Sequence, residues 1–320
     1  MTSPDGARRA EVTGAAFIAL AAVCFGTLGP LSRVAADAGV SSLTLVTWRA
    51  AVGAAVVAVF IAARMAAGSA RPAALRDIPR RDRWFMLAAA VANTLLNFSV
   101  FVAFGRISIA LALLVFYLYP ALVALVSVIW FGERLDGVRW TALAISFGGL
   151  VLVLAGAEGG VGRVDPLGIG LAFVGGLAQV FYVLAARHGF AHVPGPQAAA
   201  LTMGGAAGLY LVIAALTGAV GGLVAPIASA SALWPVLVAG VIGAGIPTVA
   251  YITGIRRLGP SRASILAMLE PVVGVLLAAW VLAEHPTVVQ LAGGALIITA
   301  AVLLQLRPRG PIADHEAIPA

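Results

Sequence analysis

The sequence contains no lysine, only one cysteine and little charge of either sign. Charged residues make up 10% of the 320 positions, whereas a soluble globular protein carries about 25%. This deficit excludes a soluble architecture. The single cysteine, Cys24, excludes a disulfide within the chain and leaves no thiol cluster for a metal site.

Apolar residues fill the place of the missing charge. They make up 62% of the chain, and the mean hydropathy is +1.05. A membrane span needs about 20 apolar residues to cross about 30 Å of hydrocarbon, so the composition is enough for about ten helices. The apolar runs lie near 13–36, 42–63, 84–104, 107–131, 138–156, 166–187, 197–218, 233–255, 260–283 and 287–306. We therefore predict an all-α integral membrane protein with ten transmembrane helices.

The 20 basic residues are all arginine and lie mostly in short stretches between apolar runs, which is typical of membrane topology and not of a nucleic-acid-binding surface. Sixteen of them fall on one side of the predicted membrane, against Arg33, Arg106 and Arg163 on the other. The positive-inside rule then predicts that both termini are cytoplasmic, in the inner (plasma) membrane. The longest Arg-rich connection, 64–83, is expected to contact anionic membrane lipids.

An internal repeat divides the chain into two halves. A shift of 151 positions lays 107–154 over 258–305 without a gap. It pairs Leu118-Tyr119-Pro120 with Leu269-Glu270-Pro271, and Glu133 with Glu284, so that proline and glutamate keep the same spacing in both copies.

A shift of 154 similarly pairs Gly14 with Gly168 and so relates span one to span six. Each half then contains five spans, 13–156 and 166–306, between short cytoplasmic segments at 1–12 and 307–320. Because five is odd, the second copy crosses the membrane in the opposite sense. The sequence therefore predicts two inverted five-helix repeats, the usual architecture of alternating-access carriers, although channels can also be built in this way.

The motifs Leu118-Tyr119-Pro120 with Gly132-Glu133, and Leu269-Glu270-Pro271 with Glu284 and Gly293-Gly294, resemble the drug/metabolite transporter superfamily, specifically its EamA-type exporters. The resemblance covers about residues 13–306. It implies a secondary carrier with a central cavity lined mainly by spans 1, 3, 4, 6, 8 and 9, and it leaves the substrate open. His285-Pro286 departs from the pattern, because relatives often continue this glutamate with a basic residue and leucine.

Glu270 is the first candidate for the chemistry of transport. It lies near the middle of span nine, where an ionised side chain is costly unless it is paired or faces water. Pro271 removes an amide donor and should bend the helix there. The carboxyl group can bind a cationic amine or exchange a proton. The alternative is a protonated glutamate that only stabilises the kink.

Further polar residues could form the wall of a substrate site. Each also has a structural alternative, namely packing or hydrogen bonding between helices. Tyr119 is the repeat partner of Glu270, Asn93 and Asn97 share a helix face, and so do Gln179 and Tyr182. Just after Pro247, the second half also offers Thr248, which matches Asn97, and Tyr251.

Other residues are candidates for structural or gating roles. Arg49, after Trp48 in span two, can neutralise Glu270 or a substrate carboxylate, or else extend toward the interface. Pro120, beside Tyr119 in span four, and Pro271, which should bend span nine, are further structural candidates. Glu133 and Glu284 end spans four and nine on opposite faces and can act as alternating gates or as plain helix-end charges.

Together these features predict a secondary active transporter that exports small organic metabolites, such as amino acids, amines or amphipathic drugs, by alternating access. We expect no catalytic residues, cofactor, metal site or nucleic-acid partner, because no nucleotide-binding loop and no histidine or cysteine cluster is present. Protons are a possible coupling ion. Gly204 and Gly208 form a small-residue face that can pack against another span or against a second copy of the chain, so a homodimer is one alternative. The alternatives are a facilitative channel or uniporter, and an intramembrane enzyme or structural subunit.

Overall fold

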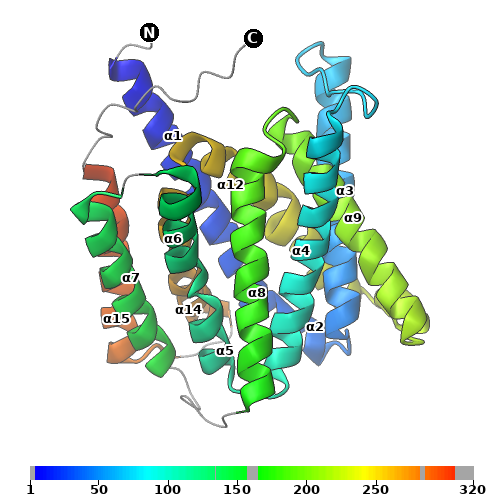
Figure 1. The fold of residues 1–320 in the computed structure, drawn as a ribbon. Coiled ribbons are helices and arrows are strands. Elements are labelled where there is room, and N and C mark those ends of the chain that lie inside the picture. The colour runs from blue at the N-terminus through cyan, green and yellow to red at the C-terminus, as the bar shows by residue number, and fades with distance from the viewer. Residues whose placement is uncertain (1–3, 134, 157–164, 282–284, 307–320) are drawn as a thin grey trace.

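The structure is a computed structural model that describes residues 4–133, 135–156, 165–281 and 285–306. In these ranges every regular element is a helix (Figure 1). The first half of the chain contains α1 (Pro4–Gly26), α2 (Leu28–Asp37), α3 (Ser42–Ala66), α4 (Arg80–Phe104), α5 (Ile109–Phe116), α6 (Tyr119–Phe131) and α7 (Gly137–Ala155). The second half contains α8 (Pro166–Leu184), η1 (Ala185–Gly189), α9 (Gly195–Leu216), α10 (Val220–Val224), η2 (Ala225–Ala228), α11 (Ala230–Gly240), η3 (Val241–Gly245), α12 (Ile246–Leu258), α13 (Pro260–Ala267), α14 (Leu269–Val281) and α15 (Val288–Leu306).

Helix occupies each of the ten predicted apolar runs. Among the described residues, 9 helical segments are long and apolar enough to cross a membrane, and the apolar helix Val288–Leu304 supplies the remaining run. The first, fourth, eighth and ninth runs each hold two successive α-helices: α1 and α2, α5 and α6, α11 and α12, and α13 and α14. The prediction of an all-α membrane fold is therefore confirmed.

Several spans begin at side chains that satisfy the first backbone amides of a helix. Ser41 accepts from the Thr44 amide, Ser108 from Leu111, Asp136 from Arg139 and Asp165 from Leu167. The first amides of a helix have no partner within the helix, so these caps stabilise its start. They explain why the spans begin close to the predicted positions.

Spans four and nine are both interrupted just before a proline. Pro120 and Pro271 lack the amide hydrogen that would bond to the carbonyls of Phe116 and Ala267, and those are the last residues of α5 and α13. The freed Phe116 carbonyl lies against Gly176 of α8, where an added Cβ would come within 3.0 Å of it. The structure therefore has the bend predicted at Pro271, and it has a second one before Pro120 at the same register of the repeat.

Span eight bends in a different way at its proline. Pro247 follows the π-helical segment η3, and because proline has no N–H, it cannot donate to the carbonyl of Gly243. The Nε atom of Arg49, on α3, donates to this carbonyl at 3.1 Å. The bend therefore creates a polar anchor inside an otherwise apolar bundle.

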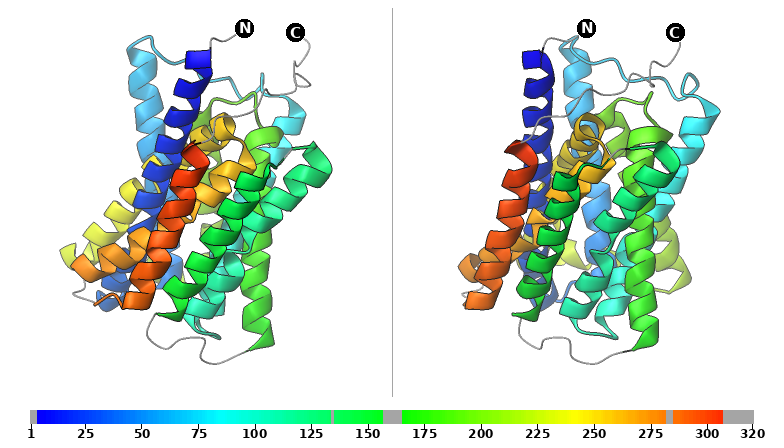
Figure 2. Two further views of the ribbon diagram at one scale, coloured as in Figure 1. Left: turned by 90° about the vertical axis from the view of Figure 1, so that its left-hand side faces the viewer. Right: turned by 60° about the vertical axis from the view of Figure 1, so that its left-hand side comes forward.

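Helices of the two halves pair in a symmetric pattern. α7 packs against α15 at one edge of the molecule, and α3 against α9 at the other (Figures 1 and 2). Between them, α4 packs against α8, and α12 against α1. Exchanging span n with span n + 5 turns the α4·α8 pair into the α12·α1 pair and leaves the two edge pairs unchanged. This is the pairing expected of two repeats related by a pseudo-two-fold axis.

Two glycines test this symmetry residue by residue. An added Cβ on Gly14 would lie 2.9 Å from Cβ of Arg257 and 3.0 Å from Cγ of Leu258. An added Cβ on Gly168 would lie 2.8 Å from Cγ2 of Ile107 and 3.0 Å from Cβ of Arg106. The repeat shift of 151 relates these two contact pairs, and the shift of 154 relates the two glycines. Both repeats therefore use the same close packing of spans.

Only some of the glycine faces pack closely. An added Cβ on Gly149 of α7 would lie 2.6 Å from the Gly293 carbonyl of α15, so the backbones touch there. On α9, Gly204 and Gly208 are exposed, and an added Cβ on Gly208 would meet no described atom within 4 Å. An added Cβ on Gly204 would lie 4.0 Å from Cβ of Ala54 on α3, so only Gly208 of this pair faces away from the other described spans.

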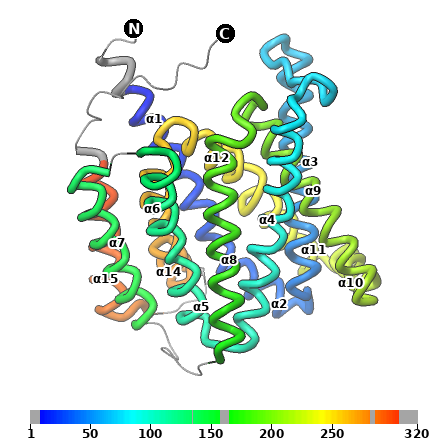
Figure 3. Tube along the Cα trace, viewed as in Figure 1, coloured from blue at the N-terminus to red at the C-terminus, as the bar shows by residue number. Residues whose placement is uncertain are grey.

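The beginning of α1 and the end of α15 lie at one end of the bundle (Figure 3). The same end carries the connection between α3 and α4. There the backbone N–H of Ala73 donates to Gln197 Oε1 at 2.9 Å, and Gln197 Nε2 donates to the backbone carbonyl of Ala73 at 2.7 Å. We call this the terminal end of the bundle, and the end with Arg106 the opposite end. The arginine-rich connections therefore gather at the terminal end.

Candidate functional site

Glu270 stands at the start of α14, directly after the break in span nine. Its carboxyl group interacts with the Tyr117 hydroxyl and, over a longer range, with the Arg49 guanidinium. The side chain is half-buried, whereas every residue of α13 is buried. The accessible surface around Glu270 therefore lies on the α14 side of the break, away from the terminal end.

Aromatic rings form one wall beside Glu270. The ring centroids of Phe116 and Tyr119 are 5.3 Å apart, and those of Tyr117 and Tyr119 are 5.9 Å apart. Tyr251 of α12 makes an edge contact with Phe25 of α1 at 6.1 Å. The first two pairs are tilted and the third is edge-to-face, and aromatic pairs at these distances stabilise each other.

Two predicted polar residues of the second half meet at this wall. Gln179 of α8 donates through Nε2 to the Tyr251 hydroxyl at 3.4 Å, and its side chain remains half-buried. Tyr251 also interacts with Tyr119 and Glu270. The structure therefore brings Glu270, Tyr119, Tyr251 and Gln179 together in one cluster.

Arg49 belongs to the same interior region but binds other residues. Its Nη1 donates to Asn97 Oδ1 at 3.0 Å, and Asn97 Nδ2 donates to the Asn93 backbone and side-chain oxygens at 2.8 Å. Arg49 and Glu270 form no ion pair within 4.0 Å among the described residues. Arg49, Asn93 and Asn97 are all half-buried.

The other predicted residues of this region are the wall candidates Tyr182 and Thr248 and the structural candidate Trp48. Tyr182 is buried, and its hydroxyl has no hydrogen-bond partner in the described part of the chain. Thr248 is buried on α12 next to Pro247. Trp48 donates to the Leu223 carbonyl at 2.8 Å and thereby fixes the α10 segment against α3. These contacts support packing roles for the three residues.

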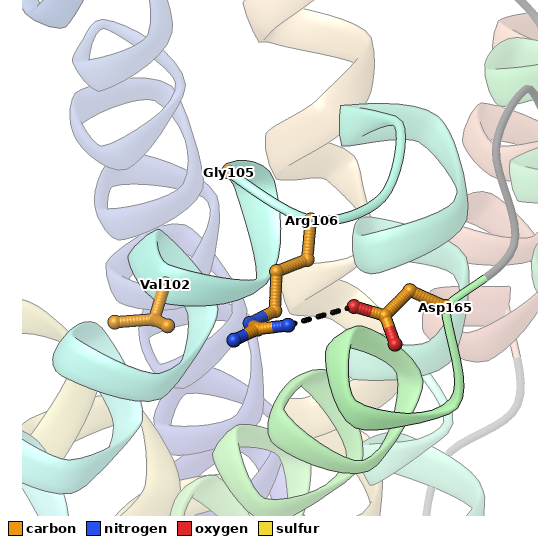
Figure 4. Close-up of a pocket in the computed structure, with 4 residues that line it drawn as sticks. All are labelled: Val102, Gly105, Arg106 and Asp165. Carbon is orange, nitrogen blue, oxygen red and sulfur yellow. Dashed lines mark hydrogen bonds and ion pairs between the residues drawn. The ribbon is translucent and has the colours of Figure 1, made fainter.

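Polar locks join the two halves at both ends of the bundle. At the terminal end, Ser261 donates to Glu133 Oε2 at 2.8 Å, and Arg139 pairs with the same carboxylate at 3.4 Å. At the opposite end, Arg106 pairs with Asp165 at 2.9 Å beside a hollow of about 330 Å³ (Figure 4). Glu284, the predicted counterpart of Glu133, lies outside the described residues.

Two interior residues were missed from the sequence, Tyr117 and Tyr210. In an unbroken helix, residues two positions apart do not share a face, so Tyr117 was not placed beside Tyr119. The break before Pro120 removes this restriction. Tyr210 is a buried polar ring on α9, and it interacts with Arg49 and Asn97. Its isolation in an apolar run was the available signal.

Comparisons with known proteins place this arrangement in a family. The EamA-like transporter family matches the chain twice, over residues 12–155 and 166–306. The chain belongs to the EamA-like transporter family. The EamA match covers both repeats, so the resemblance seen in the motifs is confirmed. This EamA protein is therefore a transporter and a multi-pass membrane protein.

Individual relatives of this EamA protein agree with that assignment. A protein of Archaeoglobus fulgidus named "Uncharacterized transporter" is 31% identical over 237 residues, which cover 74% of this chain and 81% of that protein. A solved structure described as "Crystal structure of protein" superposes with a TM-score of 0.77, at 24% identity, over 93% of this chain and 96% of that chain. The solved structure supports the fold alone.

Proposed function

We propose that this EamA-family protein is a secondary active transporter that exports small organic metabolites, namely amino acids, amines or amphipathic drugs, across the inner membrane by alternating access. The observation that carries the proposal is the half-buried polar cluster of Glu270, Gln179, Asn97 and Arg49. These residues come from both repeats, and polar groups this deep in a membrane span mark substrate or ion pathways.

The two end locks support alternating access. The Glu133–Ser261 bond joins α13 to the end of span four, and the Arg106–Asp165 pair joins the ends of spans three and six. Opening one end while the other stays closed would expose the interior cluster to one side at a time. Glu284 would take the role of Glu133 in the second repeat.

The energy source in this proposal is an ion gradient or the gradient of the substrate. The sequence offers no loop for a nucleotide, whereas Glu270 offers a carboxyl group that can exchange a proton for a cationic group. We place the terminal end in the cytoplasm, because the arginine-rich connections gather there. Exposed arginines of the 67–79 connection would then contact anionic headgroups, and the open Gly204 and Gly208 face would meet lipid or a second copy.

A facilitative channel or uniporter is the second candidate, because inverted repeats also build channels. Counterflow in proteoliposomes separates carrier from channel. We expect labelled substrate to accumulate transiently against unlabelled substrate loaded inside, with a rate that saturates. The measurement uses a panel of labelled amino acids and amines. A flux that rises linearly with concentration and is not stimulated from the opposite side would instead favour the channel.

A further inference from the structure

The two repeats pack differently at the two ends of the bundle. The repeat shift of 151 carries α5 onto α13, and α6 onto α14 to within one residue. α13 packs closely against α6, whereas the equivalent pair, α5 and α14, packs far less closely in the described ranges. Of the 8 residues in each helix, all are buried in α13, but only Ala110 and Ala112 are buried in α5. The structure is therefore closed more tightly at the terminal end than at the opposite end.

Two consecutive side chains at the start of α13 fasten this closed end. Ser261 donates to Glu133 Oε2, at the end of span four, at 2.8 Å. Arg262 donates through Nη1 to Glu11 Oε1 on α1 at 3.2 Å, and through Nη2 to the Leu304 carbonyl on α15 at 2.8 Å. Together the two residues tie α13 to the terminal ends of spans four, one and ten.

The burial of Arg262 makes the closed end depend on Glu11. The side chain of Arg262 is 3% exposed, and that of Glu11 is 14% exposed. Removing one partner of a buried ion pair is costly, because the other charge stays buried without compensation. Movement of α13 away from α1 and α15 would break both bonds of Arg262 and expose it to water. Since hydrogen bonds to charged groups are the stronger ones, these bonds favour the closed terminal end.

The first repeat cannot form the same bonds at the opposite end. The positions equivalent to Ser261 and Arg262 hold Ala110 and Leu111, whose side chains have no hydrogen-bonding group. The shift of 154 pairs Glu11 with Asp165, so the acid is kept in the second repeat. Asp165 pairs instead with Arg106, which joins spans three and six and does not fasten α5 to α14.

We propose that Ser261 and Arg262 form a one-sided lock that keeps the terminal end of the resting protein closed. Two inverted repeats with equivalent contacts would give two states of similar free energy. The lock stabilises only one of them, because α5 lacks the polar side chains of α13. Binding of substrate or of a coupling ion must then overcome the lock before the terminal end opens. This inference rests on the proposed carrier and names what sets its resting state.

A single reporter thiol on α13 tests the lock without any substrate. Ser264 is 0% exposed and lies three residues after Ser261, hence on the same helix face. Ser264→Cys in a Cys24→Ala background is treated with a membrane-impermeant thiol reagent from the terminal side of oriented proteoliposomes. We expect slow labelling when the lock is intact. Glu11→Gln should raise the labelling rate at least about tenfold, because Arg262 is left buried without a counter-charge.

Three further variants separate the lock from a general loss of structure. Ser261→Ala removes one bond and should raise the rate several-fold. Adding Arg262→Gln to Glu11→Gln removes the uncompensated charge and should return the rate most of the way to that of the intact lock. Asp77→Asn, at an exposed acid of the terminal end, is the matched control and should leave the rate unchanged.

Four results would decide against one of the two proposals. Fast labelling from the terminal side with the lock intact would overturn the closed resting state. The lock falls if Glu11→Gln labels no faster, or if it labels faster from both sides and Arg262→Gln does not reverse this. Saturable counterflow in the same liposomes with unchanged labelling would leave the carrier and overturn the lock. The expected labelling without saturable exchange of any compound would leave the lock and overturn the carrier.

Discussion

Glu270→Gln should lower the rate of substrate exchange at least about 30-fold. The substitution keeps the shape of the side chain but removes the negative charge beside Tyr117 in the bundle interior. In the proposed transport cycle this carboxylate pairs with the cationic group of the substrate. Losing one partner of a buried charge pair costs about 2 kcal/mol or more, which corresponds to about 30-fold. The initial rate of counterflow in proteoliposomes measures the effect.

The same variant should also lose the pH dependence of exchange. In the wild type, a protonated Glu270 cannot pair with an ammonium group, so exchange should fall as the pH falls. Glutamine does not titrate, and its low rate should stay flat. Asp77→Asn, at an exposed carboxylate in the connection before α4, is the control and should behave as wild type. A Glu270→Gln profile that keeps the wild-type rate and slope would reduce Glu270 to a residue that stabilises a helix bend.

Gly149→Val should destabilise the fold by about 3 kcal/mol or more. An added Cβ would lie 2.6 Å from the Gly293 carbonyl, and backbone cannot move aside as the end of a side chain can. α7 and α15 would have to separate along their contact, and overpacking of this kind typically costs about 1–3 kcal/mol and occasionally more. Unfolding of the purified protein in detergent measures the loss.

Gly148 offers the matched control one residue away. It is exposed, and an added Cβ there meets no described atom within 4 Å. Gly148→Val should therefore change stability by less than about 1 kcal/mol, because helix propensity alone is affected. Equal losses for the two variants would mean that α7 and α15 do not pack as closely as the structure places them.

Much of the fold could be predicted from sequence because membrane spans are specified by simple local properties. Length and hydropathy predicted the ten apolar helices, and proline position predicted the break before Pro271. The weak repeat also predicted the inverted architecture, and the matching environments of Gly14 and Gly168 now support it at atomic detail. What the pattern could not supply was which glycine faces touch. Gly149 and Gly208 look alike in sequence, and only the first meets a neighbouring backbone.

The candidate site was predictable only in part, because its contacts depend on the helix breaks. Glu270, Tyr119, Tyr251 and Gln179 were recognised as polar residues in apolar spans, and they lie together. Tyr117 was missed because helical spacing places it away from Tyr119. The contact between Arg49 and the Gly243 carbonyl could not be predicted from the sequence either. This carbonyl is free to accept a hydrogen bond only because Pro247 interrupts the hydrogen bonding of span eight.

Accessibility of one interior position from the two membrane sides tests alternating access most directly. Replacing Cys24 with alanine removes the only cysteine of the chain, and Asn93→Cys then places a single thiol at a half-buried position of α4 beside Asn97. A membrane-impermeant thiol reagent is applied to one side of oriented proteoliposomes, with saturating substrate on one side only. Counterflow of the same variant verifies that it still exchanges substrate.

A carrier that alternates should show opposite changes on the two sides. We predict that substrate raises the modification rate of Asn93→Cys from one side and lowers it from the other. Modification from both sides that rises or falls together would indicate a continuous pore. Modification from neither side would place Asn93 outside the transport pathway and contradict the interior cluster as the substrate site.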